Sequence, residues 1–109
     1  MKTNRVILFL CLLTLGLAGC GKHRFDREVF YDQTFCADAW DYGNTDAKTI
    51  DQMVAFVNKN GVKIRDARLV AKRGPDGCYA CTCRSGQVFY GWVREDDLAA
   101  VQKLGFRER

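Results

Sequence analysis

Gly77-Cys78-Tyr79-Ala80-Cys81-Thr82-Cys83 places three cysteines within six positions of a 109-residue chain. A cluster this dense is cross-linked by disulfides, bound to a metal ion or active in thiol exchange. Which of the three applies depends on the compartment, because thiols stay reduced in the cytosol and pair in oxidising spaces outside the inner membrane. The location of the protein therefore decides which of these three chemistries its cysteines carry out.

The first twenty residues have the pattern of a secretory signal. Lys2 and Arg5 give a charged start, an almost entirely apolar run covers residues 6–17, and small residues precede Cys20. The apolar run is shorter than the roughly 20 residues that a transmembrane helix needs. We expect residues 1–19 to be removed as a signal peptide, which leaves 109 − 19 = 90 residues and one small domain.

The segment Leu17-Ala18-Gly19-Cys20 resembles the lipobox of bacterial lipoproteins. The resemblance implies that Cys20 becomes the first mature residue and carries covalently attached lipid, while Cys11 is discarded with the signal. Two or more acyl chains hold a protein stably on a membrane. Gly21 replaces the Asp that the resemblance links to inner-membrane retention. We therefore expect a lipid-anchored protein of the cell envelope, on the outer membrane rather than the inner one, with no cofactor besides this lipid.

The charge of the mature chain is modest. Two of the cations behind the net charge of +4 lie in the signal, so the mature balance is 4 − 2 = +2. No polybasic block remains, and together with an envelope location this argues against nucleic acid as a partner. Residues 20–28 are polar and without period, which predicts a lipidated tether before a domain at 29–109. Three tether cations either attract anionic headgroups or are ordinary solvated charges: Lys22, Arg24 and Arg27.

Apolar spacing predicts a first helix that begins with a capping box from Thr49 to Gln52 and ends at Asn60-Gly61. Its first turn can extend back to Asp46. The inner stripe falls at i, i+3, i+4 and i+7 and consists of Ile50, Met53, Val54 and Val57. The same spacing predicts a second helix, with acids at 95–97 in its first turn and a Schellman ending at Gly105-Phe106.

Strands are expected between these helices. The alternation in residues 62–72 changes phase, which predicts a β-bulge near Asp66. Residues 87–93 are apolar on both parities, as in a central strand, and Gly91 indicates close packing by a neighbour such as an aromatic ring. A further short strand is expected at 29–31. The fold class is therefore a small disulfide-stabilised α+β domain of order helix, strand, strand, helix, with a two- or three-stranded mainly antiparallel sheet and both helices on one face.

Two structural disulfides are expected among the four cysteines of the mature domain, given their even number, the small core and the export signal. Cysteines at i and i+2 on an extended strand lie near the limit of disulfide reach. This favours Cys78–Cys81 with Cys36–Cys83, while Cys36–Cys81 with Cys78–Cys83 and a bridge between Cys81 and Cys83 remain alternatives. Residues 79–83 are expected to form a short strand that enters a turn at 84–86.

Metal binding and thiol exchange compete with this interpretation. Four thiolates can bind zinc, and a C-x-C arrangement suits Cu(I), but structural zinc draws its ligands from two short pairs whereas Cys36 stands alone. An oxidoreductase cysteine is expected at a helix N-terminus, which the turn before Cys78 does not provide. No Ser/His/Asp set, phosphate loop or zinc motif indicates an enzyme. Asp38 and Asp41, on either side of Trp40, are expected in turn and cap roles.

The mature chain also resembles small cysteine-containing envelope lipoproteins of unknown function. The segments that carry the resemblance are Cys-Ala-Asp-x-Trp at 36–40, Cys-x-x-Cys-x-Cys with the following Ser-Gly at 78–86, and Leu-Gly-Phe at 104–106. They cover most of the mature chain, and the resemblance implies no activity.

A protein that is fixed at one end and lacks a catalytic set acts chiefly by holding something. We therefore expect a non-catalytic binding or structural module, whose partner is an envelope protein or an anionic glycan or lipid. Arginine and aromatic side chains dominate binding hot spots. The candidate partner-binding residues are Lys63, Arg65, Arg68, Tyr90 and Trp92. A solvated or edge-guarding basic face is the plainer alternative.

Two other functions remain open from the sequence. One is a periplasmic thiol-redox or metal-handling protein that uses Cys36, Cys78, Cys81 and Cys83. The other is a protective or enzyme-inhibiting envelope lipoprotein that uses the basic strand.

Overall fold

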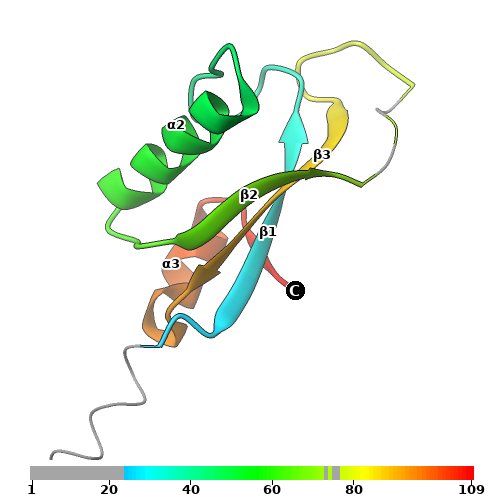
Figure 1. Ribbon diagram of the computed structural model, residues 1–109. Helices are drawn as coiled ribbons and strands as arrows, with labels where there is room; N and C mark the ends of the chain where they lie inside the picture. The colour runs from blue at the N-terminus through cyan, green and yellow to red at the C-terminus, as the bar shows by residue number, and fades with distance from the viewer. Residues whose placement is uncertain (1–23, 73, 75–76) are drawn as a thin grey trace, which may run out of the picture.

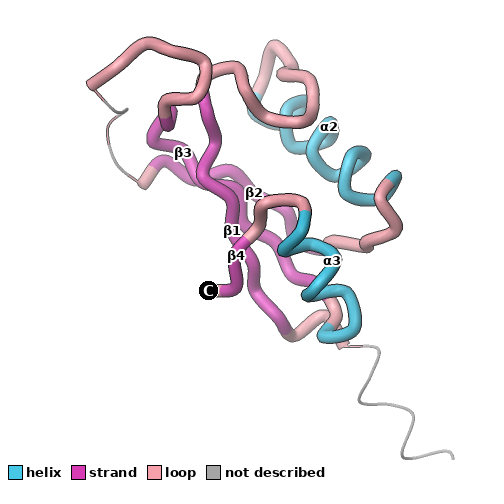
Figure 2. The backbone as a smooth tube through the Cα atoms, turned by 180° about the vertical axis from the view of Figure 1, so that it is seen from behind, coloured by secondary structure: helices cyan, strands magenta, loops and turns pink. Residues whose placement is uncertain are grey.

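Two helices cover one face of a four-stranded antiparallel sheet in a computed structural model (Figure 1), which describes residues 24–72, 74 and 77–109. Figure 2 shows both helices on the same side of the sheet. The predictions on the signal, the lipobox and Cys20 lie outside the described residues. The elements are β1 (Arg27–Thr34), α2 (Asp46–Lys59), β2 (Arg65–Ala71), β3 (Arg84–Val93), the 3-10 turn η2 (Glu95–Asp97), α3 (Leu98–Lys103) and β4 (Arg107–Glu108).

The α+β class and the antiparallel sheet are confirmed, but the sheet has four strands in the order β2-β3-β1-β4 rather than two or three. The strand expected at 29–31 is longer and lies inside the sheet. It begins at Arg27, so Arg27 and Glu28 belong to the sheet and not to a tether. The small β4 was missed because its two residues are polar and exposed.

The first helix starts at a different cap from the one expected. Thr45 is the N-cap, and its hydroxyl accepts a hydrogen bond from Lys48 N at 3.2 Å. Thr49 is only 4% exposed, and its hydroxyl accepts from Gly43 N at 3.0 Å. Thr49 therefore fastens the preceding loop onto the helix, and the predicted capping box is wrong. The expected end is confirmed, with Asn60 as C-cap and Gly61 at φ 83°.

The second helix ends as its sequence predicts. Phe106 N donates to Val101 O at 3.3 Å, and Gly105 N donates to Gln102 O at 3.0 Å. Gly105 has φ 101°, the left-handed conformation of a Schellman motif. The acidic segment before the helix forms η2 instead of an α-helical turn.

The bulge predicted near Asp66 is confirmed. Asp66 has φ 52°, and the β2–β3 register shifts by one residue between Arg65 and Arg68. Gly91 does have a close neighbour, but this is the side chain of Ile64 rather than an aromatic ring. The turn expected at 84–86 is instead the start of β3.

The core lies between the helices and the inner face of the sheet. Its buried members are Val29, Trp40, Met53, Val57, Val62, Phe89, Val93, Val101 and Phe106. The Trp40 ring centroid lies 4.9 Å from that of Tyr31 and 5.4 Å from that of Phe89. Trp40 thus joins the segment after β1 to the sheet. No helix in the described part of the chain is long and apolar enough to cross a bilayer.

The disulfides join Cys36 to Cys81 and Cys78 to Cys83, so the expected pairing is wrong and its stated alternative is right. Cys36 N donates to Cys81 O at 3.2 Å, which places the two Cα atoms 4.5 Å apart. Residues 80–83 form a turn, closed by Cys83 N donating to Ala80 O, instead of the expected strand. The turn brings Cys83 round to Cys78.

Candidate binding surface

One face of the sheet is not covered by any described helix, and we call it the open face (Figure 2). Paired residues of adjacent strands point to the same side of a sheet. Arg65 pairs with Trp92, and Arg68 pairs with Tyr90. Phe30 of β1 also pairs with Tyr90, so it shares this face.

The bulge in β2 brings predicted site residues together. From Arg65 to Arg68 the chain advances three residues, while the partner strand advances only two, from Trp92 to Tyr90. In a regular strand without a bulge, two residues three positions apart would point to opposite sides of the sheet. Four of the five candidate residues therefore share the open face, and the fifth, Lys63, lies just before β2.

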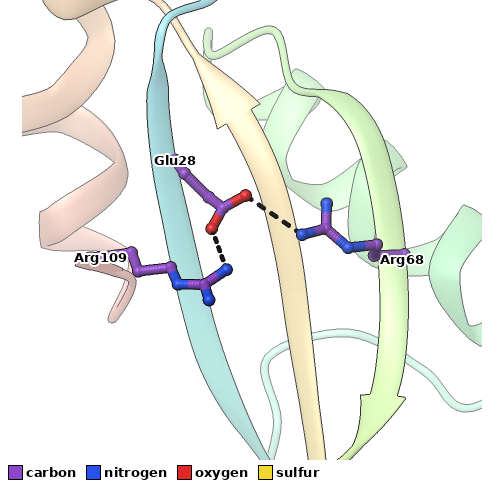
Figure 3. Close-up of polar contacts among 3 residues, drawn as sticks. All are labelled: Glu28, Arg68 and Arg109. Atoms are coloured by element: carbon purple, nitrogen blue, oxygen red, sulfur yellow. Dashed lines mark hydrogen bonds and ion pairs between the residues drawn. The ribbon is translucent and has the colours of Figure 1, made fainter.

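An ion-pair network crosses the open face (Figure 3). The carboxylate of Glu28 accepts from Arg68 Nη2 at 3.1 Å and from Arg109 Nη1 at 2.5 Å. Its side chain is only 13% exposed. The hydrogen bond from Arg109 and that from Arg68 lower the pKa of Glu28, although burial opposes them. The network links β1 to β2 and to the C-terminal residue.

The ring of Tyr90 lies at the centre of a group of cations. The charged groups of Arg68, Lys72 and Arg109 lie 5.0, 5.3 and 5.4 Å from the ring centroid. These distances are within the range of cation–π attraction. Because Tyr90 is only 8% exposed, it supports the cations and offers little surface of its own to a partner.

A second cation–aromatic pair lies on the β1–β4 side of the open face. The Arg107 guanidinium lies 4.8 Å from the Phe30 ring centroid, and its Nη2 lies 2.8 Å from the Asp32 carboxylate. The acids of the open face, Glu28 and Asp32, therefore pair with three of its arginines.

A cavity of about 580 Å³ lies beside the start of β2, and we call it the Phe25 cavity. Its lining residues are Phe25, Asn58, Gly61, Val62, Lys63, Ile64, Arg65 and Arg94. The Phe25 ring has the Arg65 guanidinium 4.1 Å from its centroid and the Arg94 guanidinium at 4.7 Å. Two of the predicted site residues, Lys63 and Arg65, thus line this cavity.

Sequence reasoning missed Phe25, Glu28, Lys72, Arg94, Arg107 and Arg109 as members of these surfaces. Glu28 and Arg109 are 81 residues apart, so no local pattern links them. Phe25 did carry a weak signal, since it is an aromatic residue within an otherwise polar segment.

The described cysteines and Asp38 take structural positions. All four described cysteines are in disulfides, and within residues 24–72 and 77–109 no group of three His, Cys, Asp or Glu side chains is placed to hold a metal ion. Asp38 Oδ1 accepts from Thr34 Oγ1 at 2.8 Å and from Tyr31 Oη at 3.1 Å. Burial and then the neighbouring Asp38 raise the pKa of Tyr31. Asp38 has the turn role that the sequence predicts.

Comparison of the chain with protein-family models, with curated proteins and with solved structures finds no match. The open face and the Phe25 cavity, together with the N-terminal sequence pattern, are therefore the basis for inferring a function.

Proposed function

We propose that this chain is a lipoprotein of the bacterial cell envelope, anchored through lipid on Cys20, whose domain is a non-catalytic binding module. The binding surface is the open face, and the partner is an acidic envelope protein. An outer-membrane location is part of the proposal, since Gly21 follows the proposed lipidated residue.

One observation supports the binding role most directly: the arginines of the open face are held in position before any partner arrives. Arg68 is hydrogen-bonded to Glu28 and lies over the Tyr90 ring, yet 43% of its side chain is exposed. Ordering flexible side chains is one of the costs of association. Arginines that are already ordered avoid part of this cost, and each keeps N–H donors for the carboxylates of a partner.

The charge of the open face favours an acidic partner. Arg65, Arg68, Lys72, Arg107 and Arg109 contribute five positive charges, against the two negative charges of Glu28 and Asp32, which leaves 5 − 2 = +3. Such a field speeds the encounter with an acidic surface and weakens with salt.

Capture of envelope proteins by the mature lipidated protein tests the proposal. Arg68→Gln with Lys72→Gln removes two charges from the open face and leaves the Arg109–Glu28 pair intact. The matched control is Lys59→Gln with Lys103→Gln, which removes two charges from the helix ends. We expect the first pair to reduce capture at least tenfold and to weaken the salt dependence of capture, while the control protein keeps both the level and the salt dependence of the wild type. Equal capture by all three folded proteins would show that the open face is only a solvated surface.

The anchor has its own test. Cys20→Ser is expected to leave the precursor uncleaved at this site and without acyl mass. If the mature wild-type chain is instead cut elsewhere and carries no acyl group, the proposed anchor and location are wrong. Fractionation of the two membranes then tests the outer-membrane part of the proposal.

The two alternative functions can be distinguished from the proposed one by experiment. A thiol-redox or metal-handling role requires reduction of at least one of the two disulfides, because neither metal ligation nor attack proceeds from a paired cysteine. A protective or enzyme-inhibiting role would appear in the capture experiment as an enzyme bound through the open face.

A further inference from the structure

We propose that the Phe25 cavity is a phosphate-binding site, and that its occupant is the headgroup phosphate of an anionic phospholipid in the anchoring membrane. This site shares Arg65 with the open face, but its other two cations, Lys63 and Arg94, lie outside that face. It rests on the proposed function only through the anchor at Cys20, which places the cavity near a membrane.

Three cations from two segments of the chain converge on this cavity. Lys63 comes from the connection between α2 and β2, Arg65 from the first position of β2, and Arg94 from the residue after β3. The ring of Phe25 fixes two of them, with the Arg65 and Arg94 guanidiniums 4.1 and 4.7 Å from its centroid. A guanidinium held over a ring keeps N–H donors at its edge, in the fork geometry that suits phosphate oxygens.

These cations lack the counter-charges that the open face has. Arg68, Arg107 and Arg109 each pair with a carboxylate. In the part of the chain that the structure describes, no carboxylate lies within ion-pair distance of the three cavity cations, and no acid lines the cavity.

The acids that neighbour the cavity residues in sequence do not neutralise them. Asp26, Asp66 and Glu95 adjoin lining residues but do not line the cavity, and Glu95 pairs with Arg27. Three like charges around one hollow repel one another, and a bound anion relieves this repulsion.

Arg94 also has an unused donor. Its Nε is buried and has no hydrogen-bond partner among the described residues. Buried N–H groups in folded proteins nearly always have an acceptor. An anion in the cavity would supply acceptor oxygens beside this guanidinium.

The position of the cavity indicates which phosphate it meets. Phe25 follows Cys20 by five residues, and five extended residues reach at most about 18 Å. A lipid on Cys20 therefore keeps the cavity within headgroup reach. A volume of about 580 Å³ lies within the range of small-molecule sites, roughly 300–1,000 Å³. Arg27, one of the expected tether cations, pairs with Glu95 and Glu108 and is not available for this role.

Titration of the mature lipidated protein in a neutral detergent tests the site. The probes are short-chain phosphatidylglycerol, glycerol 3-phosphate, inorganic phosphate and, at matched ionic strength, chloride. The readout is the amide resonances of Gly61, Lys63 and Arg65. We expect saturable shifts with the three phosphates and none with chloride, with phosphatidylglycerol binding at least tenfold more tightly than inorganic phosphate.

Variants locate the binding. Arg65→Gln with Arg94→Gln is expected to weaken phosphatidylglycerol binding at least tenfold, and Lys63→Gln alone gives a milder test if that pair destabilises the fold. Lys59→Gln with Lys103→Gln removes the same charge from the helix ends and is expected to retain binding. Equal weakening by the control, or no saturable shift with any phosphate, would overturn the site. Inorganic phosphate binding as tightly as the lipid would overturn the lipid occupant.

The two proposals fail separately. Arg94→Gln alone removes a cavity cation that lies outside the open face, so this variant is expected to weaken phosphate binding and to capture the partner protein normally. Loss of partner capture in the open-face pair likewise says nothing about the phosphate titration.

Discussion

The two disulfides are expected to contribute unequally to stability, because they close loops of different length. The loop-closure entropy that a disulfide removes from the unfolded chain grows with the logarithm of the loop. The Cys36–Cys81 bridge spans 45 residues and the Cys78–Cys83 bridge spans 5. The loop relation then gives about 4 kcal/mol for the first and about 2 kcal/mol for the second.

The perturbation is to replace one pair of cysteines at a time by alanine. Cys36, Cys78 and Cys81 are exposed, whereas Cys83 is 8% exposed, so any lost packing adds to the cost of removing the short bridge. The lost packing would make removal of the short bridge look more costly, which is opposite to the expected difference between the two bridges.

The assay is urea unfolding of each oxidised variant, after mass analysis has shown that one bridge remains. We expect the Cys36→Ala/Cys81→Ala protein to be less stable by about 2 kcal/mol than the Cys78→Ala/Cys83→Ala protein, or roughly 8–16 °C in Tm. Equal stabilities, or the reverse order, would refute the loop-entropy argument. In the wild type we expect no titratable thiol before reductant and four after it. Free thiols with bound zinc or copper would favour the metal-handling alternative.

Two further predictions concern the sheet. Because hydrogen bonds from Arg109 and Arg68 lower the pKa of Glu28, its contribution to stability is present above its unfolded value of about 4.5 and is lost as pH falls through the lower folded value. We expect Glu28→Gln to flatten this acid limb of the free energy of unfolding against pH, and an unchanged limb would contradict the network. Gly91→Ala places a Cβ 2.5 Å from Ile64 Cγ1 and is expected to cost about 1–3 kcal/mol in thermal unfolding. Adding Ile64→Val is expected to recover part of that loss, and a neutral Gly91→Ala would show that the contact relaxes freely.

Local patterns predicted the parts of the fold that local interactions determine. The stripe of α2, the stop at Asn60-Gly61 and the Schellman ending at Gly105 all follow from contacts within a few residues. The bulge at Asp66 could be predicted because apolar and polar residues change their order of alternation there. One extra residue in the strand accounts for such a change. Thr49 was wrongly predicted as the N-cap of α2, because a buried threonine in the first helical turn and an N-cap threonine occur in similar sequence contexts.

Long-range pairings were not predictable from sequence in the same way. The cysteine pairing depends on how the chain after β1 runs beside residues 81–83, which is seen in the hydrogen bond from Phe35 N to Cys83 O. The short β4 exists because Val29 pairs with Glu108 and Phe30 with Arg107, far across the chain. The same holds for the candidate site. The bulge in β2, which the sequence predicts, places Arg65 and Arg68 on one face, whereas the contact between Glu28 and Arg109 forms only in the folded sheet.

The position of β1 in the sheet has a consequence for the order of folding. β1 comes first in the described chain but lies between β3 and β4, the last two strands to be made. When the chain emerges with its amino end first, β1 therefore cannot pair with β3 and β4 until almost all remaining residues have emerged. Non-local pairings of this kind form late, because the intervening loop must close first. Until β3 and β4 are available, both edges of β1 lack the neighbours that they have in the folded sheet.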